Sequence, residues 1–130
     1  MGNAIFLSDG EETILDKVKT AITDPARITL KDKGNPEVCI VSEYHKVFNS
    51  EEYGNICSMC RNAAIGCTGC KKNLADVLNT LLSPIRQKRK SFEEKPIYIQ
   101  EILESGSEKA RTEGTKTLEA VKEAMSMKYF

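Results

Sequence analysis

Most of the cysteines in this 130-residue chain are concentrated in one short segment, CSMCRNAAIGCTGC. They form two CxxC pairs, Cys57 with Cys60 and Cys67 with Cys70. Two thiols three residues apart can share one face of a helix or a tight turn, and the glycines beside the second pair let the backbone fold back. Four thiolates are typical ligands of a zinc ion or of an iron–sulfur cluster. The spacing therefore predicts a metal site without deciding which metal.

The fifth cysteine, Cys39, can be either a ligand or a packing residue. Bringing it to the two pairs closes a longer loop, which costs about 2 kcal/mol at about 0.6 kcal/mol for each doubling of loop length. Four metal–thiolate bonds exceed that cost. Its neighbours Val38, Ile40 and Val41 are apolar, however, and a free cysteine often behaves as a small buried apolar residue. The residues alone leave both roles open.

Other uses of the thiols fit the sequence less well. An odd count of five cysteines does not close a disulfide framework. The N-terminus, MGNAIFLSDG, lacks the basic start and long apolar core of a signal peptide, and no apolar run approaches the roughly 20 residues of a membrane span. We therefore expect a cytoplasmic protein with no membrane partner, where clustered cysteines more often bind metal than form disulfides. A thioredoxin-like redox pair would follow a strand, which the pattern does not predict.

Composition and periodicity predict an all-α fold. Apolar residues make up 40% of the chain and charged residues 29%, with 19 basic against 19 acidic side chains, so the chain can bury a single core. Apolar residues recur at helical spacing nearly throughout, without the alternation typical of strands. The expected architecture is a bundle of five to seven helices.

Local signals place the first two helices. Ser8 and Glu11 are spaced as a capping box for a helix that ends before Pro25, since the residue before a proline leaves helical geometry. Asn35 can cap a second helix with Pro36 in its first turn, where a missing N–H costs nothing.

The next two helices surround the CxxC pairs. One is expected to begin at Ser50 and to stop before Gly66. The other is expected from about Cys70 to Leu82, and Pro84 would kink it or start a continuation.

Two further helices are expected near the C-terminus. Pro96 opens one that closes at Ser105–Gly106, and Ser107 caps a long last one. The single histidine, His45, falls in an apolar pattern, so we expect it to be packed rather than catalytic.

Basic residues gather between positions 61 and 90, where Asp76 is the only acidic residue. They are Arg61, Lys71, Lys72, Arg86, Lys88, Arg89 and Lys90. Such a stripe attracts phosphates and gives salt-dependent binding of nucleic acid. A charge run by itself is more often a solvated helix face, so this alternative stays open at the level of the residues.

Six segments, taken in order, resemble the C-terminal part of bacterial tryptophanyl-tRNA synthetases. They are GNAIFLSD (2–9), TDPARI (23–28), GNPEVCIVSEYHKVF (34–48), AIGCTGCKKNLADVL (64–78), LSPIRQKR (82–89) and TLEAVKEAMSM (117–127). Together they cover essentially the whole chain.

The resemblance implies a fragment of an enzyme. In that family "GN" follows the lysine-containing signature loop of the catalytic site, and this chain begins with Met1 where that loop would end. We expect it to lack the catalytic domain, the ATP signatures and the tryptophan pocket, and to be inactive alone. Residues 1–10 would connect to the catalytic domain, and residues 11–130 would form a helical tRNA-binding domain with a cysteine metal site. The implied partners are the tRNA(Trp) anticodon, the catalytic domain of the same synthetase and, for the full-length enzyme, ATP and a second subunit.

A subset of these synthetases carries a 4Fe–4S cluster whose last three ligands follow C-x6-C-x2-C. In this sequence that pattern falls on Cys60, Cys67 and Cys70, and Cys39 matches the first ligand, although its spacing is slightly shorter. Cys57 is then spare. If the metal is zinc, Cys57 replaces Cys39.

The resemblance also favours the basic stripe as an RNA surface rather than a solvated face. The candidate RNA contacts are Lys71, Lys72, Arg86, Lys88, Arg89 and Lys90. Two rival interpretations remain. One is a stand-alone iron–sulfur or zinc module that is not tied to an enzyme. The other is a tRNA-binding domain whose cysteines only pack.

Overall fold

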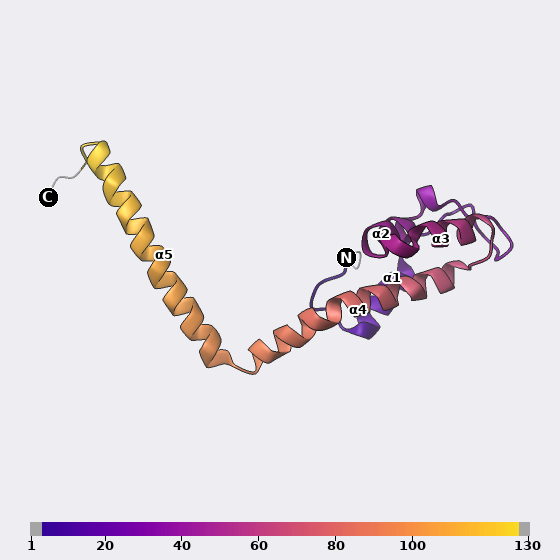
Figure 1. Cartoon of the computed structure of the whole chain (residues 1–130), viewed down its shortest axis with the longest axis horizontal. Helices are drawn as coiled ribbons and strands as arrows, with labels where there is room; N and C mark the ends of the chain where they lie inside the picture. The colour runs from indigo at the N-terminus through magenta and orange to yellow at the C-terminus, as the bar shows by residue number, and fades with distance from the viewer. Residues whose placement is uncertain (1–3, 128–130) are drawn as a thin grey trace. The chain divides into compact units, whose positions relative to one another are not determined.

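The computed structural model describes residues 4–127, and every regular element in this range is helical (Figure 1). In chain order they are α1 Glu11–Thr20, the 3₁₀ turn η1 Pro36–Val38, α2 Ile40–Phe48, α3 Ser50–Arg61, α4 Cys67–Glu93 and α5 Pro96–Ala124. The prediction of an all-α fold with five to seven helices is confirmed for these residues. The chain divides into two compact units, Met1–Gln87 and Lys88–Phe130, which are described separately. The domain bounds predicted from the sequence stay a prediction.

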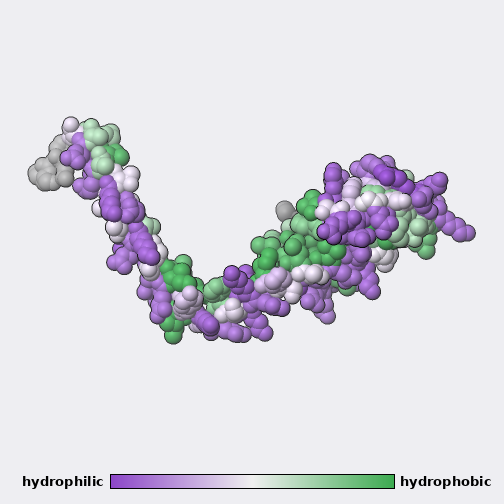
Figure 2. All heavy atoms as spheres, viewed as in Figure 1, coloured by the Kyte–Doolittle hydropathy of each residue, from purple (hydrophilic) through white to green (hydrophobic). Residues whose placement is uncertain are grey.

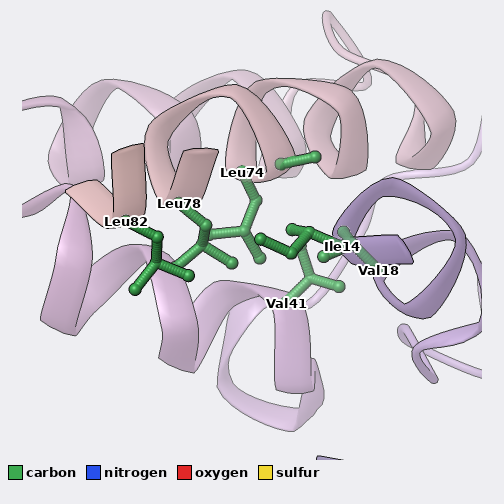
Figure 3. Packing of buried hydrophobic residues seen from close by; sticks show 7 residues of the cluster. Ile14, Val18, Val41, Leu74, Leu78 and Leu82 are labelled. Atoms are coloured by element: carbon green, nitrogen blue, oxygen red, sulfur yellow. The ribbon is translucent and has the colours of Figure 1, made fainter. Parts of the chain in front are cut away.

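The core of the first unit lies between α1, α2 and α4 (Figure 3). Its buried side chains are Ile14, Val18, Val41, Leu74, Ala75, Leu78 and Leu82. On α1 and α4 they recur three to four residues apart, which puts them on one face of each helix. Burying an aliphatic side chain of this size contributes about 1.5–3 kcal/mol to the free energy of unfolding. Leu74, Leu78 and Leu82 therefore provide most of the packing of α4 against α1 and α2.

Leu78→Ala is expected to lower the free energy of unfolding by about 2–5 kcal/mol, because it removes buried methyl groups and leaves a cavity. Leu78 is 3% exposed, whereas Leu81 on the same helix is 48% exposed. Leu81→Ala is therefore the matched control and should change stability by only about 0.5 kcal/mol. Denaturant unfolding of the two variants checks this. Equal losses would mean that α4 does not pack through the face that carries Leu78.

Helix α1 begins differently from the sequence prediction. The capping box predicted at Ser8 is wrong, because the N-cap is Gly10 and no side chain caps the helix there. Asp9 instead orders the segment before the helix. Its Oδ2 accepts hydrogen bonds from the Phe6 N–H at 2.8 Å and from Lys17 Nζ at 2.5 Å.

The predicted second helix is split at Cys39. Asn35 does cap its first turn, since its side chain accepts a hydrogen bond from the N–H of Glu37, and Pro36 opens the turn as predicted. This turn is 3₁₀, however, and ends at Val38. Cys39 then takes an extended conformation, and its carbonyl accepts the first hydrogen bonds of α2. The prediction of one uninterrupted helix is wrong, and the break places Cys39 between two helical elements.

Helices α4 and α5 are both longer than predicted. Helix α4 starts at Cys67 rather than at Cys70 and continues through Pro84, whose ring removes one backbone donor without ending the helix. Helix α5 runs on without the break predicted at Ser105–Gly106. A glycine inside a helix costs about 1 kcal/mol relative to alanine, and the good helix formers on either side outweigh that cost.

In the second unit, α5 buries none of its residues. Apolar side chains are exposed near both ends of the helix (Figure 2), among them Ile102 and Val121. At the start of α5, the ring of Tyr98 stacks on that of Phe92 near the end of α4, with centroids 6.5 Å apart across the short connection. Within the described residues, no helix combines the length and the apolar character needed to cross a membrane.

Candidate functional site

The turn between α3 and α4 sends the chain back toward the end of α3. Ala63 has a left-handed conformation with φ of 55°, and its N–H donates to the Cys60 carbonyl at 3.1 Å. The N–H of Ala64 donates to the Met59 carbonyl at 2.8 Å. These two hydrogen bonds form the Schellman motif that ends a helix and reverses the chain. As a result, Cys67 opens the next helix close to the cysteine that closes the previous one.

Four thiols from three segments meet around this turn. The electrostatic neighbours of Cys60 include Cys39 and Cys67, and those of Cys70 include Cys39, Cys60, Cys67 and Cys57. Burial, reinforced by these neighbouring thiols, raises the pKa of Cys70 to about 12. Without a metal this thiol is therefore protonated at neutral pH. The electrostatic neighbours of Cys70 thus include the distant Cys39, and they include Cys57 as well. The predicted ligand set stays a prediction.

Cys57 has different surroundings from the other four cysteines. It is buried, with 5% of its surface exposed, whereas the others are all partly exposed. Its Sγ lies 4.0 Å from the hydroxyl of Ser42 on α2. Cys57 therefore takes part in the packing between α2 and α3.

A loop from Asp24 to Asn35 covers the Cys60 thiol. Asp24 closes the loop, since its carboxylate accepts hydrogen bonds from the N–H of Ala26 at 2.9 Å and of Asn35 at 2.8 Å. The loop holds Arg27 so that its Nη1 lies 3.8 Å from Cys60 Sγ. Burial raises the pKa of Cys60, and the positive charge of Arg27 partly opposes that effect.

Gly34 lets this loop approach α3. A Cβ at this position would lie 2.5 Å from Cys60 Sγ, so any side chain there would displace the thiol. The Gly34 N–H also donates to the Cys60 carbonyl at 3.1 Å. Beside it, Arg61 of α3 forms an ion pair with Glu37 of η1, which ties the segment before Cys39 to the same helix.

His45 fixes the first turn of α4 from the side of α2. It is fully buried, as predicted, and its Nε2 lies 3.2 Å from the Cys70 carbonyl. Its Nδ1 lies 3.4 Å from Asn49 Nδ2, which can only donate. Nδ1 is then the acceptor and Nε2–H the donor, which matches a neutral ring. Burial lowers the pKa of His45 in the same direction.

The thiols are neighbours, but they do not surround one point. Among residues 4–127, no three His, Cys, Asp or Glu side chains are grouped closely enough to hold a single metal ion. Zinc with four sulfur ligands at about 2.3 Å requires sulfur–sulfur distances of about 3.8 Å. In a four-iron cluster each thiolate binds a different iron, so the four sulfurs lie farther apart.

Sequence reasoning missed Arg27 and Gly34. Both lie in quoted segments, TDPARI and GNPEVCIVSEYHKVF, ahead of Cys39 in the chain, but neither residue type by itself indicates a metal site. Their contacts with Cys60 depend on the folding of the whole loop from Asp24, which a spacing rule does not contain.

The predicted RNA-binding residues have different surroundings. In the first unit, Lys71 donates to the Lys19 carbonyl at 2.7 Å, Lys72 is exposed, and Arg86 forms hydrogen bonds inside the fold. In the second unit, Lys88, Arg89 and Lys90 are all exposed on the last turns of α4. Of these, Arg89 pairs with Glu93 at 2.7 Å, and both side chains remain largely solvated.

Asp9→Asn is expected to destabilise the protein at neutral pH and to have no effect in acid. Hydrogen bonds from Lys17 and from the Phe6 N–H hold the pKa of Asp9 below its usual value. A lowered carboxyl pKa stabilises the fold above the unfolded pKa of about 4, and this contribution is lost as pH falls through the lower folded pKa. Thermal unfolding at pH 7 and near pH 2.5 checks the expectation. Asp16→Asn, on the exposed face of α1, is the control, and a variant effect that persists in acid would contradict the assignment.

The chain is similar to known proteins over nearly its whole length. A family model described as tRNA synthetases class I (W and Y) matches residues 1–83. The tryptophan–tRNA ligase of Treponema pallidum is 43% identical over 98% of this chain and 38% of that ligase. The one from Aquifex aeolicus is 39% identical over 97% of this chain and 32% of that ligase. The chain thus spans about two fifths or less of these relatives, and it matches their C-terminal part.

One solved structure has the same fold. The tryptophanyl-tRNA synthetase from Campylobacter jejuni, crystallised with ADP and tryptophan, superposes with a TM-score of 0.83. The superposition covers 95% of this chain and 39% of that chain, at 23% identity. At this level of identity the likeness concerns the fold alone.

Proposed function

The chain belongs to the class I tRNA synthetases of the tryptophan and tyrosine group, and we propose that it is the part of a tryptophan–tRNA ligase that binds tRNA(Trp) and recognises its anticodon. The main support is its identity to the C-terminal part of tryptophan–tRNA ligases over nearly the whole chain. We assign ATP use and catalysis to the part of these ligases that this chain does not span. The proposal includes a homodimeric ligase and a cytoplasmic location.

We also propose that Cys39, Cys60, Cys67 and Cys70 hold a 4Fe–4S cluster. Four cysteine thiolates are the usual ligands of such a cluster. Cys60 and Cys70 each have other thiols of this set among their electrostatic neighbours. All four thiols are partly exposed, which leaves them accessible to iron. When bound, the cluster supplies four iron–thiolate cross-links and leaves the ligase chemistry to other parts of the enzyme.

The surroundings of the thiols favour this ligand set over a zinc site. A zinc site would use Cys57 in place of Cys39, yet the Cys57 thiol packs against Ser42 inside the fold. Arg27 would donate to a ligand sulfur and offset part of the negative charge of the cluster.

The cross-links would shape a surface next to basic side chains. They join the break before α2, the end of α3 and the first turn of α4, and Lys72 is exposed on the next turn of that helix. Phosphate contacts position an RNA, while unpaired loop bases are read through their edges and by stacking. A rigid, basic helix end is suited to the first of these tasks.

Metal analysis and tRNA binding on the purified chain test the proposal. Protein prepared without oxygen should contain about four iron and four sulfide per chain and be brown. It should bind tRNA(Trp) more tightly than the same tRNA with a changed anticodon. If the protein contains one zinc and no iron, the zinc site is correct and the cluster is rejected. Equal affinity for both tRNAs would reject anticodon recognition, and no tRNA binding would favour a stand-alone metal module.

A further inference from the structure

Arg86 belongs to the basic stripe of α4, but its guanidinium is turned into the fold. Nη1 donates to the Asp9 carbonyl and to Asn79 Oδ1, and Nη2 donates to Glu11 Oε1 and to the Asn79 carbonyl, all at 3.3 Å. The side chain is only 17% exposed. The two terminal nitrogens of an arginine carry four N–H groups in total, and these four bonds use all of them. Little of this guanidinium remains for a phosphate.

Two partners of Arg86, Asp9 and Glu11, belong to the segment Phe6–Glu11, which leads into α1. The third partner, Asn79, lies on α4 itself. This segment is also held from the other side. Lys17 of α1 donates to Asp9 Oδ2, and its Nζ lies 4.7 Å from the centroid of the Phe6 ring. The Asp9 N–H closes the segment by donating to the Phe6 carbonyl at 3.0 Å. This short segment is therefore held by two charged side chains, Arg86 of α4 and Lys17 of α1.

Hydrogen bonds that involve a charged group are about twice as strong as neutral ones, so the bonds from Arg86 and Lys17 make the segment stiff. Most of the length of the related ligases precedes the part that matches this chain. The segment Phe6–Glu11 thus lies where that preceding portion joins the helices. Whatever fixes the segment on α4 also fixes the direction in which the preceding portion is attached.

We propose that Arg86 is a positioning residue: it locks the segment Phe6–Glu11 onto α4 and so sets how the preceding portion of the ligase meets a tRNA held by the helices. This inference rests on the proposed function. Joining tryptophan to tRNA requires the bound tRNA to reach the catalytic portion in a productive orientation, and small misplacements cost large factors in rate. Arg86 touches no substrate and acts through Asp9 and Glu11.

The first test measures tRNA(Trp) affinity of the chain at several salt concentrations for Arg86→Gln, Asn79→Ala and the control Arg111→Gln, an exposed arginine of α5. Removing a phosphate contact lowers the slope of log affinity against log salt by about 1. The proposal expects an unchanged slope for Arg86→Gln. A slope reduced by about 1 would make Arg86 an RNA contact and overturn the inference.

The second test places the same substitutions in the complete ligase and measures two reactions. Tryptophan activation, followed by ATP–pyrophosphate exchange, should be unchanged. The kcat for charging tRNA(Trp) should fall about tenfold for Arg86→Gln and for the uncharged Asn79→Ala, but not for Arg111→Gln. Asn79→Ala removes no charge. If both variants lose charging activity, the cause is therefore the lost hydrogen bonds around Arg86 rather than the lost positive charge.

Several outcomes separate the two proposals. If Arg86→Gln and Asn79→Ala both leave tRNA charging unchanged, Arg86 has no positioning role. An equal loss of tryptophan activation and tRNA charging would also overturn that role, because it indicates a general folding defect. If the wild-type chain binds no tRNA, the proposed function fails, while the charging rates of the complete ligase still decide the role of Arg86.

Discussion

With the proposed 4Fe–4S cluster bound, Cys70→Ser is expected to remove its iron and sulfide and to lower the free energy of unfolding by about 4 kcal/mol or more. Serine presents a weaker oxygen ligand, and loss of one ligand releases the cross-links among the three segments. Loss of a structural metal is one of the few mechanisms by which a single substitution has so large an effect. Iron and sulfide analysis together with denaturant unfolding checks both parts.

Cys57→Ser is the matched control for this experiment. It makes the same replacement of sulfur by oxygen, but in a buried thiol that faces the Ser42 hydroxyl. We expect the variant to keep its iron and to lose only about 1–2 kcal/mol, because a hydroxyl can bond with the neighbouring serine. Cys39→Ser should behave like Cys70→Ser. The reverse pattern, with metal lost from the Cys57 variant and kept in the Cys39 variant, would identify the zinc ligand set instead.

The raised pKa of Cys70 makes metal binding depend on pH. At neutral pH the metal-free thiol is protonated, and a metal must displace that proton to form the thiolate. This proton release lowers the apparent affinity for the metal at neutral pH, so metal uptake should strengthen as pH rises. A protein stripped by a chelator under reducing conditions should unfold at a denaturant concentration close to that of the Cys70→Ser variant.

Local sequence signals predicted the helices best where one strong signal stands alone. Ser50 begins α3 and Pro96 begins α5 as expected. The errors occur where neighbouring residues or tertiary contacts outweigh one local signal. Cys39 leaves the helical conformation although its neighbours have helical spacing, and α5 passes through Gly106 although serine and glycine are typical of a helix end. Propensity is a weak prior that such contexts override.

The candidate site shows the same division. Spacing alone was enough to single out the two CxxC pairs, and the family resemblance added Cys39. The neighbours that would tune the site could not be predicted, because Arg27 reaches Cys60 only through a loop that Asp24 closes. Composition placed Arg86 in a phosphate-binding stripe, and only coordinates show its hydrogen bonds to the segment before α1.

Replacing Lys88, Arg89 and Lys90 together by glutamine is expected to weaken tRNA binding by at least tenfold at low salt. Each lysine or arginine that neutralises a phosphate releases a counterion, so the slope of log affinity against log salt should fall by about 2–3. The three side chains are exposed, and the pair of Arg89 with Glu93 is a surface ion pair worth at most about 1 kcal/mol. A phosphate can therefore displace Glu93.

A second triple variant separates local contacts from net charge. Changing Arg111, Lys116 and Lys122 on α5 to glutamine removes the same charge from the chain, away from the stripe. Long-range attraction depends on the total charge and is screened beyond about 10 Å in 0.1 M salt. If both triple variants weaken binding equally, the basic residues of α4 act only through overall charge. If the α4 variant alone loses affinity and slope, the end of α4 lies against the RNA backbone, which is where a domain that holds an anticodon needs its phosphate contacts.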